Sequence, residues 1–281
     1  MAVGLSALLI GLLCDNFNTR KLFLVLCVCG FTGLMLSSVS SLGFGILFGA
    51  SVSMVRCGSF SSPMKLFPDA LSWSVVWQSI SKSLSTFVIP LFVLGTSTFI
   101  GWDFTISILA FVYLCVGLLI YKMMPDDVMT KYDLREVGKW VKSWKVWLTF
   151  IALSSTSLYM IFMSRMVPTL TSQGYTIEDA MFLVLVLGFI EIVGRFPAAW
   201  IADKFDSYII PFAVIRLSDA VFLWFVLPYS PILAIVLHFT FQSASTPTMW
   251  PAITRSVGPQ YVSTFYGLCA FAGYVAITFL F

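Results

Sequence analysis

Long apolar runs alternate along the chain with short polar connections, and each run is about as long as a bilayer is thick. Because roughly 20 helical residues cross the hydrocarbon core, we expect each run to form a transmembrane helix. The pattern predicts about ten such spans, at residues 1–17, 22–40, 42–64, 70–96, 102–123, 146–170, 177–202, 207–227, 230–252 and 260–281. The predicted fold class is therefore all-α, a polytopic membrane protein of about ten transmembrane helices.

The basic residues indicate which side of the membrane each connection faces. Of the 16 Lys and Arg residues, 11 lie in alternate connections, whereas the intervening connections near residues 38–41, 96–103, 171–179 and 228–231 contain none. Lys and Arg accumulate in cytoplasmic loops, so the basic connections are predicted to be cytoplasmic. Both chain ends then lie outside, and compared with a topology that has cytoplasmic ends, one helix is missing at each end.

One long polar segment, residues 125–145, divides the predicted spans five and five. Within it, apolar residues follow the i, i+3, i+4, i+7 spacing of one helix face among several Lys and Arg residues: Val137, Trp140, Val141 and Trp144. This pattern predicts an amphipathic helix that lies on the anionic lipids of the inner leaflet near residues 131–145. A solvated linker is the alternative.

The two halves of the chain also resemble each other. Residues 11–17 (GLLCDNF) align with residues 199–205 (AWIADKF), and each copy ends a span just before a cytoplasmic connection. Repeated bundles around a central site are typical of secondary transporters. We therefore predict two pseudo-symmetric bundles, at 1–124 and 146–281, joined by the linker at 125–145.

Composition excludes several classes of protein. With 59% hydrophobic and only 10% charged residues, the chain does not have the composition of a soluble protein. The six cysteines lack the spacing of zinc ligands and are expected to be buried packing residues. No phosphate-binding loop, zinc-protease motif or nucleophile elbow occurs, so we expect no enzyme activity, no cofactor and no metal. Nucleic-acid binding has no support either.

A pair of opposite charges lies deep within the seventh predicted span. Glu191 and Arg195 are four residues apart, on one helix face, about 18 Å and about 12 Å from Asp203 at the cytoplasmic end. A charge in the hydrocarbon core is costly unless it faces protein or a water-filled cavity, so such residues are functional candidates. The alternative is a structural ion pair that fixes helix packing. Side chains locked against each other, with no cavity at the guanidinium of Arg195, would indicate this alternative.

Other cations accompany this pair. Counted by depth, five cations but only two acids are embedded in the spans: Arg56, Lys82, Arg165, Arg195 and Arg216 against Glu191 and Asp219. An anionic substrate would offset this imbalance, and the planar fork of arginine suits a carboxylate. The substrate-binding candidates are Arg195, Lys82, Arg56 and Arg165.

Structural alternatives stay open for several of these residues. Arg56 could instead pair with Asp15, and Arg165 could extend to the outer headgroups. Arg216 and Asp219 are expected to form a structural pair, and His238 to be a packed core histidine.

Residues 11–21 (GLLCDNFNTRK) resemble the G-x-x-x-D-[RK]-x-G-[RK]-[RK] loop motif of the major facilitator superfamily through Gly11, Asp15 and Arg20. The second copy retains the acid as Asp203. This resemblance implies a fold of twelve helices in two bundles, of which the chain would hold the second through the eleventh. It also implies gating roles for Gly11, Asp15, Arg20 and Asp203.

Within that superfamily, three segments resemble the monocarboxylate transporters. FIEIVGRFPAAWIAD resembles their acidic-x-x-x-Arg helix through Glu191 and Arg195. Residues 256–268 (SVGPQYVSTFYGL) resemble their Val-Gly-Pro-Gln connection, and residues 100–110 resemble the Gly-Trp start of their sixth helix. The resemblance implies a proton-linked carrier of small monocarboxylates in the plasma membrane.

A mechanism follows as a hypothesis. Ionised Glu191 neutralises Arg195 and weakens its affinity for an anion, whereas a desolvated site favours the protonated form of a carboxyl group. Protonation of Glu191, the proton-coupling candidate, would then free Arg195 for a substrate carboxylate. The expected partners are a small organic anion, a proton and membrane lipids. The alternatives are an exchanger of organophosphate or oxalate type, and a truncated membrane protein that does not transport.

Overall fold

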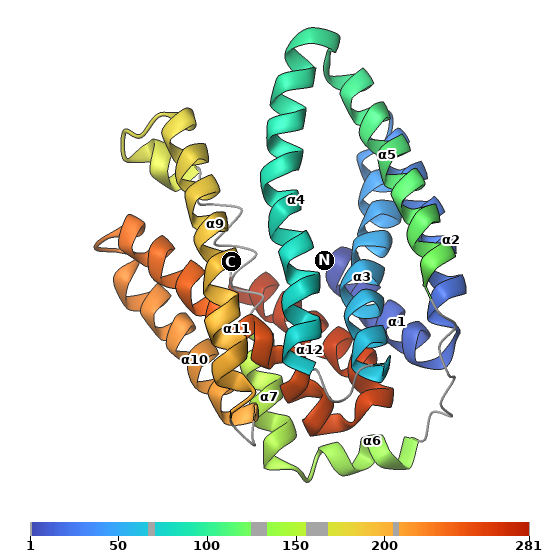
Figure 1. Ribbon diagram of the computed structural model, residues 1–281, viewed down its shortest axis with the longest axis vertical. Helices are drawn as coiled ribbons and strands as arrows, with labels where there is room; N and C mark the ends of the chain where they lie inside the picture. The colour runs from blue at the N-terminus through green and yellow to red at the C-terminus, as the bar shows by residue number, and fades with distance from the viewer. Residues whose placement is uncertain (1, 67–70, 125–133, 156–167, 205–207, 281) are drawn as a thin grey trace. The chain divides into compact units, whose positions relative to one another are not determined.

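The protein is described by a computed structural model over residues 2–66, 71–124, 134–155, 168–204 and 208–280 (Figure 1). Within these ranges every regular element is a helix, which confirms the predicted all-α class. The helices of the amino-terminal half are α1 (Ala2–Asn16), α2 (Thr19–Met35), α3 (Ser41–Leu66), α4 (Leu71–Ile100) and α5 (Trp102–Met123). The remaining elements are α6 (Leu134–Trp140), α7 (Trp144–Ser154), α9 (Ile177–Ala202), α10 (Ile209–Val226), α11 (Pro231–Val257), the 3₁₀ turn η1 (Pro259–Tyr261) and α12 (Val262–Leu280).

The helices follow the hydrophobic pattern of the sequence. Each predicted span overlaps one of them, and for the span at 146–170 the structure describes α7 and then the chain from residue 168. Within the described residues, α5 and α10 are each long and apolar enough to cross a membrane by themselves. Three prolines lie inside helices: α9 continues through Pro197, and α11 continues through Pro247 and Pro251.

The turn between α4 and α5 is a single residue. Gly101 has a φ of 81°, a left-handed value that glycine adopts without steric cost. Asp103 then lies in the first turn of α5, where a negative charge is favourable beside the helix N-terminus.

The amphipathic helix in the structure is shorter than the apolar pattern in the sequence predicts. Helix α6 ends at Trp140, where the amides of Lys142 and Ser143 turn back onto the carbonyls of Lys139 and Trp140. Val141 is exposed in the turn and Trp144 begins α7, so only the first half of the predicted apolar face lies on α6. Contact of this segment with lipid stays a prediction.

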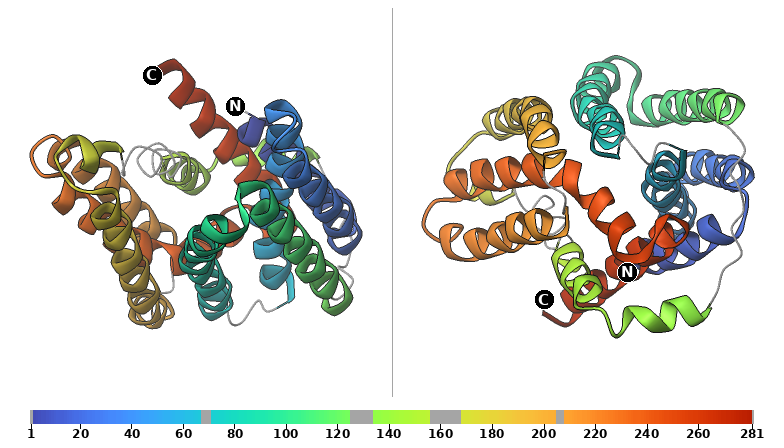
Figure 2. Two further views of the ribbon diagram at one scale, coloured as in Figure 1. Left: turned by 90° about the horizontal axis from the view of Figure 1, so that it is seen from above. Right: turned by 60° about the horizontal axis from the view of Figure 1, so that its bottom comes forward.

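The helices group into two compact units. The first comprises residues 1–66, 89–138 and 257–281, and the second comprises 67–88 and 139–256. In the first unit, α2 packs against α3 and α5, and α1 packs against α3 and α12 (Figure 2). The predicted division of the chain at residues 125–145 stays a prediction.

In the first unit, small residues bring the backbones of α1 and α12 into contact. A Cβ atom added at Gly11 would meet the carbonyl of Ser263, and one added at Gly267 would meet the carbonyl of Ala7. Ala7 and Gly11 are four residues apart, as are Ser263 and Gly267, and the order of the contacts makes the two helices antiparallel. Small residues at this spacing allow the close approach that drives helix association in membranes.

This packing predicts that Gly11→Ala destabilises the protein. The added methyl group would overlap a backbone carbonyl that has no side-chain freedom, and such overpacking typically costs about 1–3 kcal/mol. Thermal and denaturant unfolding in detergent would measure the loss. Gly45→Ala is the matched control, because a Cβ at Gly45 on α3 meets nothing within 4 Å and alanine is the better helix former. Equal stability of the two variants would contradict the proposed backbone contact.

Candidate functional site

Helix α9 carries the charged pair, and its start is fixed locally. The side chain of Thr176 caps it by accepting a hydrogen bond from the amide of Asp179, at 3.1 Å. Glu178 and Asp179 lie in the first turn, where negative charge is stabilised by the positive end of the helix dipole. The helix runs without a break to Ala202, so Glu191 and Arg195 lie on consecutive turns of one face.

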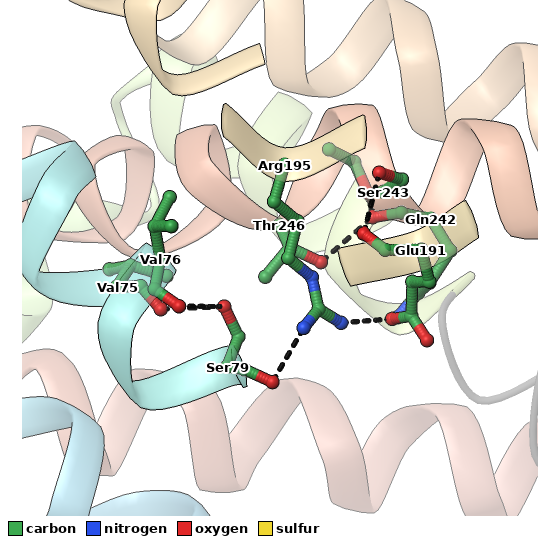
Figure 3. A network of polar contacts seen from close by, with 9 residues as sticks. Val75, Val76, Ser79, Glu191, Arg195, Gln242, Ser243 and Thr246 are labelled. Atoms are coloured by element: carbon green, nitrogen blue, oxygen red, sulfur yellow. Dashed lines mark hydrogen bonds and ion pairs between the residues drawn. The ribbon is translucent and has the colours of Figure 1, made fainter. Parts of the chain in front are cut away.

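Glu191 and Arg195 are in direct contact (Figure 3). Nη2 of Arg195 donates to Oε1 of Glu191, and the two side chains are 0% and 7% exposed, respectively. Nη1 of Arg195 donates to the backbone carbonyl of Ser79 on α4, at 2.5 Å. A carbonyl oxygen has two lone pairs, so the oxygen of Ser79 can accept this bond in addition to a helical one. Arg195 thus links α9 to the first half of α4.

Helix α11 approaches the same pair from another direction. The hydroxyl of Ser243 donates to the backbone carbonyl of Glu191, at 3.0 Å. Gly194 allows this approach, since a Cβ there would overlap the hydroxyl of Ser243. Gln242 is 7% exposed, and the hydroxyl of Thr246 donates to its backbone carbonyl at 2.7 Å. Neutral polar residues of α11 therefore lie next to the charged pair (Figure 3).

A cavity of about 280 Å³ lies between α9, α10 and α11. Its walls are mostly apolar: Gly194, Pro197, Ala198, Ile201, Ala202, Pro211, Ile215, Ala244 and Thr248. Neither Glu191 nor Arg195 belongs to these walls. In this arrangement the pair is packed against protein, which is the geometry that the structural alternative predicts.

A second set of buried charges joins α10 to α11. Oδ2 of Asp219 lies 3.5 Å from Nη1 of Arg216, and its Oδ1 lies 2.8 Å from Nδ1 of His238. All three residues are buried: Arg216 is 3% exposed, Asp219 5% and His238 1%. Arg216 and Asp219 are one turn apart, so helical spacing predicts their contact, whereas His238 is 19 residues from Asp219 and no local spacing connects it.

The gating candidates of the first unit hold its helices together. Oδ2 of Asp15 accepts a hydrogen bond at 2.6 Å from the amide of Thr264, in the first turn of α12. Through this bond Asp15, which is 3% exposed, caps the start of a helix that lies far away in the sequence. Nε of Arg20 donates to the carbonyl of Tyr121 at 2.9 Å, and its guanidinium lies 4.8 Å from the centre of that ring. Gly11 contacts Ser263 as described above.

The remaining predicted residues are less informative. Asp203 is the C-cap residue of α9 and accepts a hydrogen bond from the hydroxyl of Tyr208 at 3.4 Å. Arg56 and Lys82 lie on α3 and α4, but their side chains are outside the described part of the structure, and Arg165 is outside the described residues altogether. Gating and substrate binding by all these residues stay predictions. In the described ranges, no group of three or more His, Cys, Asp or Glu residues is arranged to hold a metal ion.

Comparison with known proteins identifies the family. The family model of the Major Facilitator Superfamily matches residues 1–280. The crystal structure of the human organic anion transporter MFSD10 (TETRAN) matches with a TM-score of 0.68 and 16% sequence identity, over 98% of this chain and 72% of that one. No curated protein sequence matches the chain. The structural likeness, at this identity, shows a shared fold, and because the family model covers nearly the whole sequence, the chain belongs to the Major Facilitator Superfamily of integral membrane transporters.

Proposed function

We propose that this protein moves small monocarboxylate anions together with protons across the plasma membrane by alternating access. The observation that carries the proposal is the buried contact between Glu191 and Arg195 on α9. It joins a group that can take up a proton to the cation best suited to bind a carboxylate. The pair therefore provides both parts of a proton-coupled anion site within one turn of a helix.

The proposed cycle exchanges one carboxylate for another. While Glu191 is ionised, it occupies part of the guanidinium fork of Arg195 and balances its charge. A proton on Glu191 removes that balance, and an uncompensated buried charge is strongly unfavourable. A substrate carboxylate then restores neutrality by taking the place of Glu191 at the fork, while the carbonyl of Ser79 continues to accept from Nη1. Release of the proton reforms the pair and expels the anion.

Two further observations support an anionic substrate. Counted by depth along the sequence, the embedded residues are five cations against two acids, an excess that an anion would offset. The solved structure with the same fold is described as that of an organic anion transporter. Exchangers of organophosphate or oxalate type would use the same excess of cations, and they differ in not requiring a proton gradient.

A structural role for the pair is the second candidate. The guanidinium of Arg195 is 0% exposed and both of its named partners are protein groups, as expected for a pair that only fixes helix packing. In that case the chain would be a membrane scaffold without transport. The proposed cycle differs because it requires an arrangement in which the pair opens.

Uptake into proteoliposomes separates the three functions. We expect radiolabelled lactate or pyruvate to accumulate when the outside is made acidic, and not when a protonophore collapses the gradient. Counterflow that does not depend on the pH gradient would indicate an exchanger. The absence of both would indicate a scaffold and contradict transport by this chain.

Replacement of Arg195 tests the anion site. Arg195→Lys keeps the positive charge but loses the planar fork, and charge-assisted hydrogen bonds of this kind contribute about 1.5–3 kcal/mol. We therefore expect uptake at low substrate concentration to fall by about tenfold or more. Arg255→Lys is the matched control, since Arg255 is exposed near the end of α11. Unchanged uptake by the Arg195 variant would rule out the proposed site.

Replacement of Glu191 tests the proton coupling. Glu191→Gln resembles the protonated acid, so anion counterflow should persist while the response to an imposed pH gradient disappears. Glu178→Gln provides the control, because it changes an exposed acid in the first turn of the same helix and should keep the gradient response. Gradient-driven accumulation by Glu191→Gln would contradict the role given to Glu191.

A further inference from the structure

The cluster of Arg216, Asp219 and His238 has no part in the cycle proposed above. Its three residues are at most 5% exposed, and they come from two helices of the same unit. Asp219 contacts both of the others, at 3.5 Å to Arg216 and 2.8 Å to His238. Three titratable or charged groups in the core of a membrane protein are costly, which makes them candidates for function.

Hydrogen-bond chemistry fixes the direction of the contact between His238 and Asp219. A carboxylate only accepts, so the imidazole donates through Nδ1–H. In the neutral ring, the lone pair then lies on Nε2, which can take up a proton. With neutral His238 the charges of Arg216 and Asp219 cancel. A proton added at Nε2 would place the positive charge of the imidazolium 2.8 Å from the carboxylate of Asp219.

Among the described residues, several helices near α10 and α11 carry charged groups, including α7, which packs against α10 and has Lys145 near its start. Besides Arg216 and Asp219 on α10, the packed helix α9 contributes Glu191 and Arg195 in its interior and Glu178 and Asp179 in its first turn. Helix α11 itself carries Arg255 near its cytoplasmic end. Of these, Asp219 is in direct contact with the imidazole.

The position of the cluster suggests what it does. His238 and Asp219 are each seven residues from a helix end, Pro231 and Val226, which corresponds to a depth of about 10 Å. Glu191 is 14 residues from the start of α9, at a depth of about 21 Å from the same side. His238 is one turn of α11 before Gln242 and Ser243, and Ser243 contacts Glu191.

We propose that His238, held by Asp219, is a second proton-binding site of this transporter, lying between the outer ends of the helices and Glu191. The proposal rests on proton coupling as the proposed function. Nε2 takes up one proton from the outer side, the ring becomes an imidazolium, and Nδ1–H stays on Asp219. Loss of that proton returns the ring to its neutral form, so the step needs no reactant other than the proton.

The sequence contains one histidine, which makes a direct test available. Protein labelled with ¹⁵N-histidine, purified without a histidine tag and placed in nanodiscs, gives a nitrogen spectrum from His238 alone. We expect a neutral ring protonated at Nδ1 that converts to the imidazolium as the medium is taken from about pH 8 to about pH 5. A ring that stays neutral over this range would overturn the proposal.

Two variants of Asp219 test the role of its carboxylate. In Asp219→Asn the opposite charge beside the ring is gone, so the conversion should no longer follow that of the parent. Asp219→Glu retains the carboxylate and should restore most of the conversion. The same titration in the Asn variant as in the parent would overturn the proposed contact. His238→Gln removes the signal and confirms its assignment.

Uptake measurements link the site to transport. In His238→Gln we expect gradient-driven uptake to fall several-fold at a mildly acidic outside pH, while counterflow stays near that of the parent. An unchanged dependence of uptake on outside pH would overturn the proposal. If the parent shows no gradient-driven uptake, proton coupling itself fails, even where the nitrogen spectrum shows that His238 titrates. If the parent is coupled and His238 does not titrate, only this inference fails.

Discussion

The need to neutralise charge inside a hydrocarbon core is the constraint on which this structure depends. An ion transferred from water into such an interior loses several kcal/mol, and removing one partner of a buried pair typically costs about 3–5 kcal/mol. Arg195 satisfies this constraint with Glu191 one turn away and with the carbonyl of Ser79 on α4. Ser243 of α11 then bonds to the backbone of Glu191. The guanidinium of Arg195 thereby joins α9 to α4, and the backbone carbonyl of Glu191 joins α9 to α11.

The same constraint accounts for the other buried charges that the structure describes. Asp15 is placed against the amide of Thr264 at the start of α12, where free amides and the helix dipole both favour an anion. Asp219 is placed between a guanidinium and an imidazole. Each arrangement holds helices together in its present state. Each also involves an ionisable group, and the proposed cycle would use a change of ionisation to couple helix packing to transport.

The sequence predicted the helices better than it predicted the contacts. Apolar runs located the helices because chain length and hydropathy are local properties, and the i, i+4 spacing brought Glu191 and Arg195 together for the same reason. The acceptor provided by Ser79 is a backbone atom and leaves no mark in the sequence. Asp15 and Thr264 are 249 residues apart, so helical periodicity could not connect them.

Whether the charged pair opens when an anion binds is the central question about this site. Binding and protonation are reciprocal if they are linked, so an anion that displaces Glu191 from Arg195 must raise the affinity of the protein for protons. The most direct measurement is the change in pH when lactate is added to the purified protein in weakly buffered detergent solution. The proposed cycle predicts uptake of about one proton per bound anion. Saturable binding of lactate without any uptake of protons would contradict it.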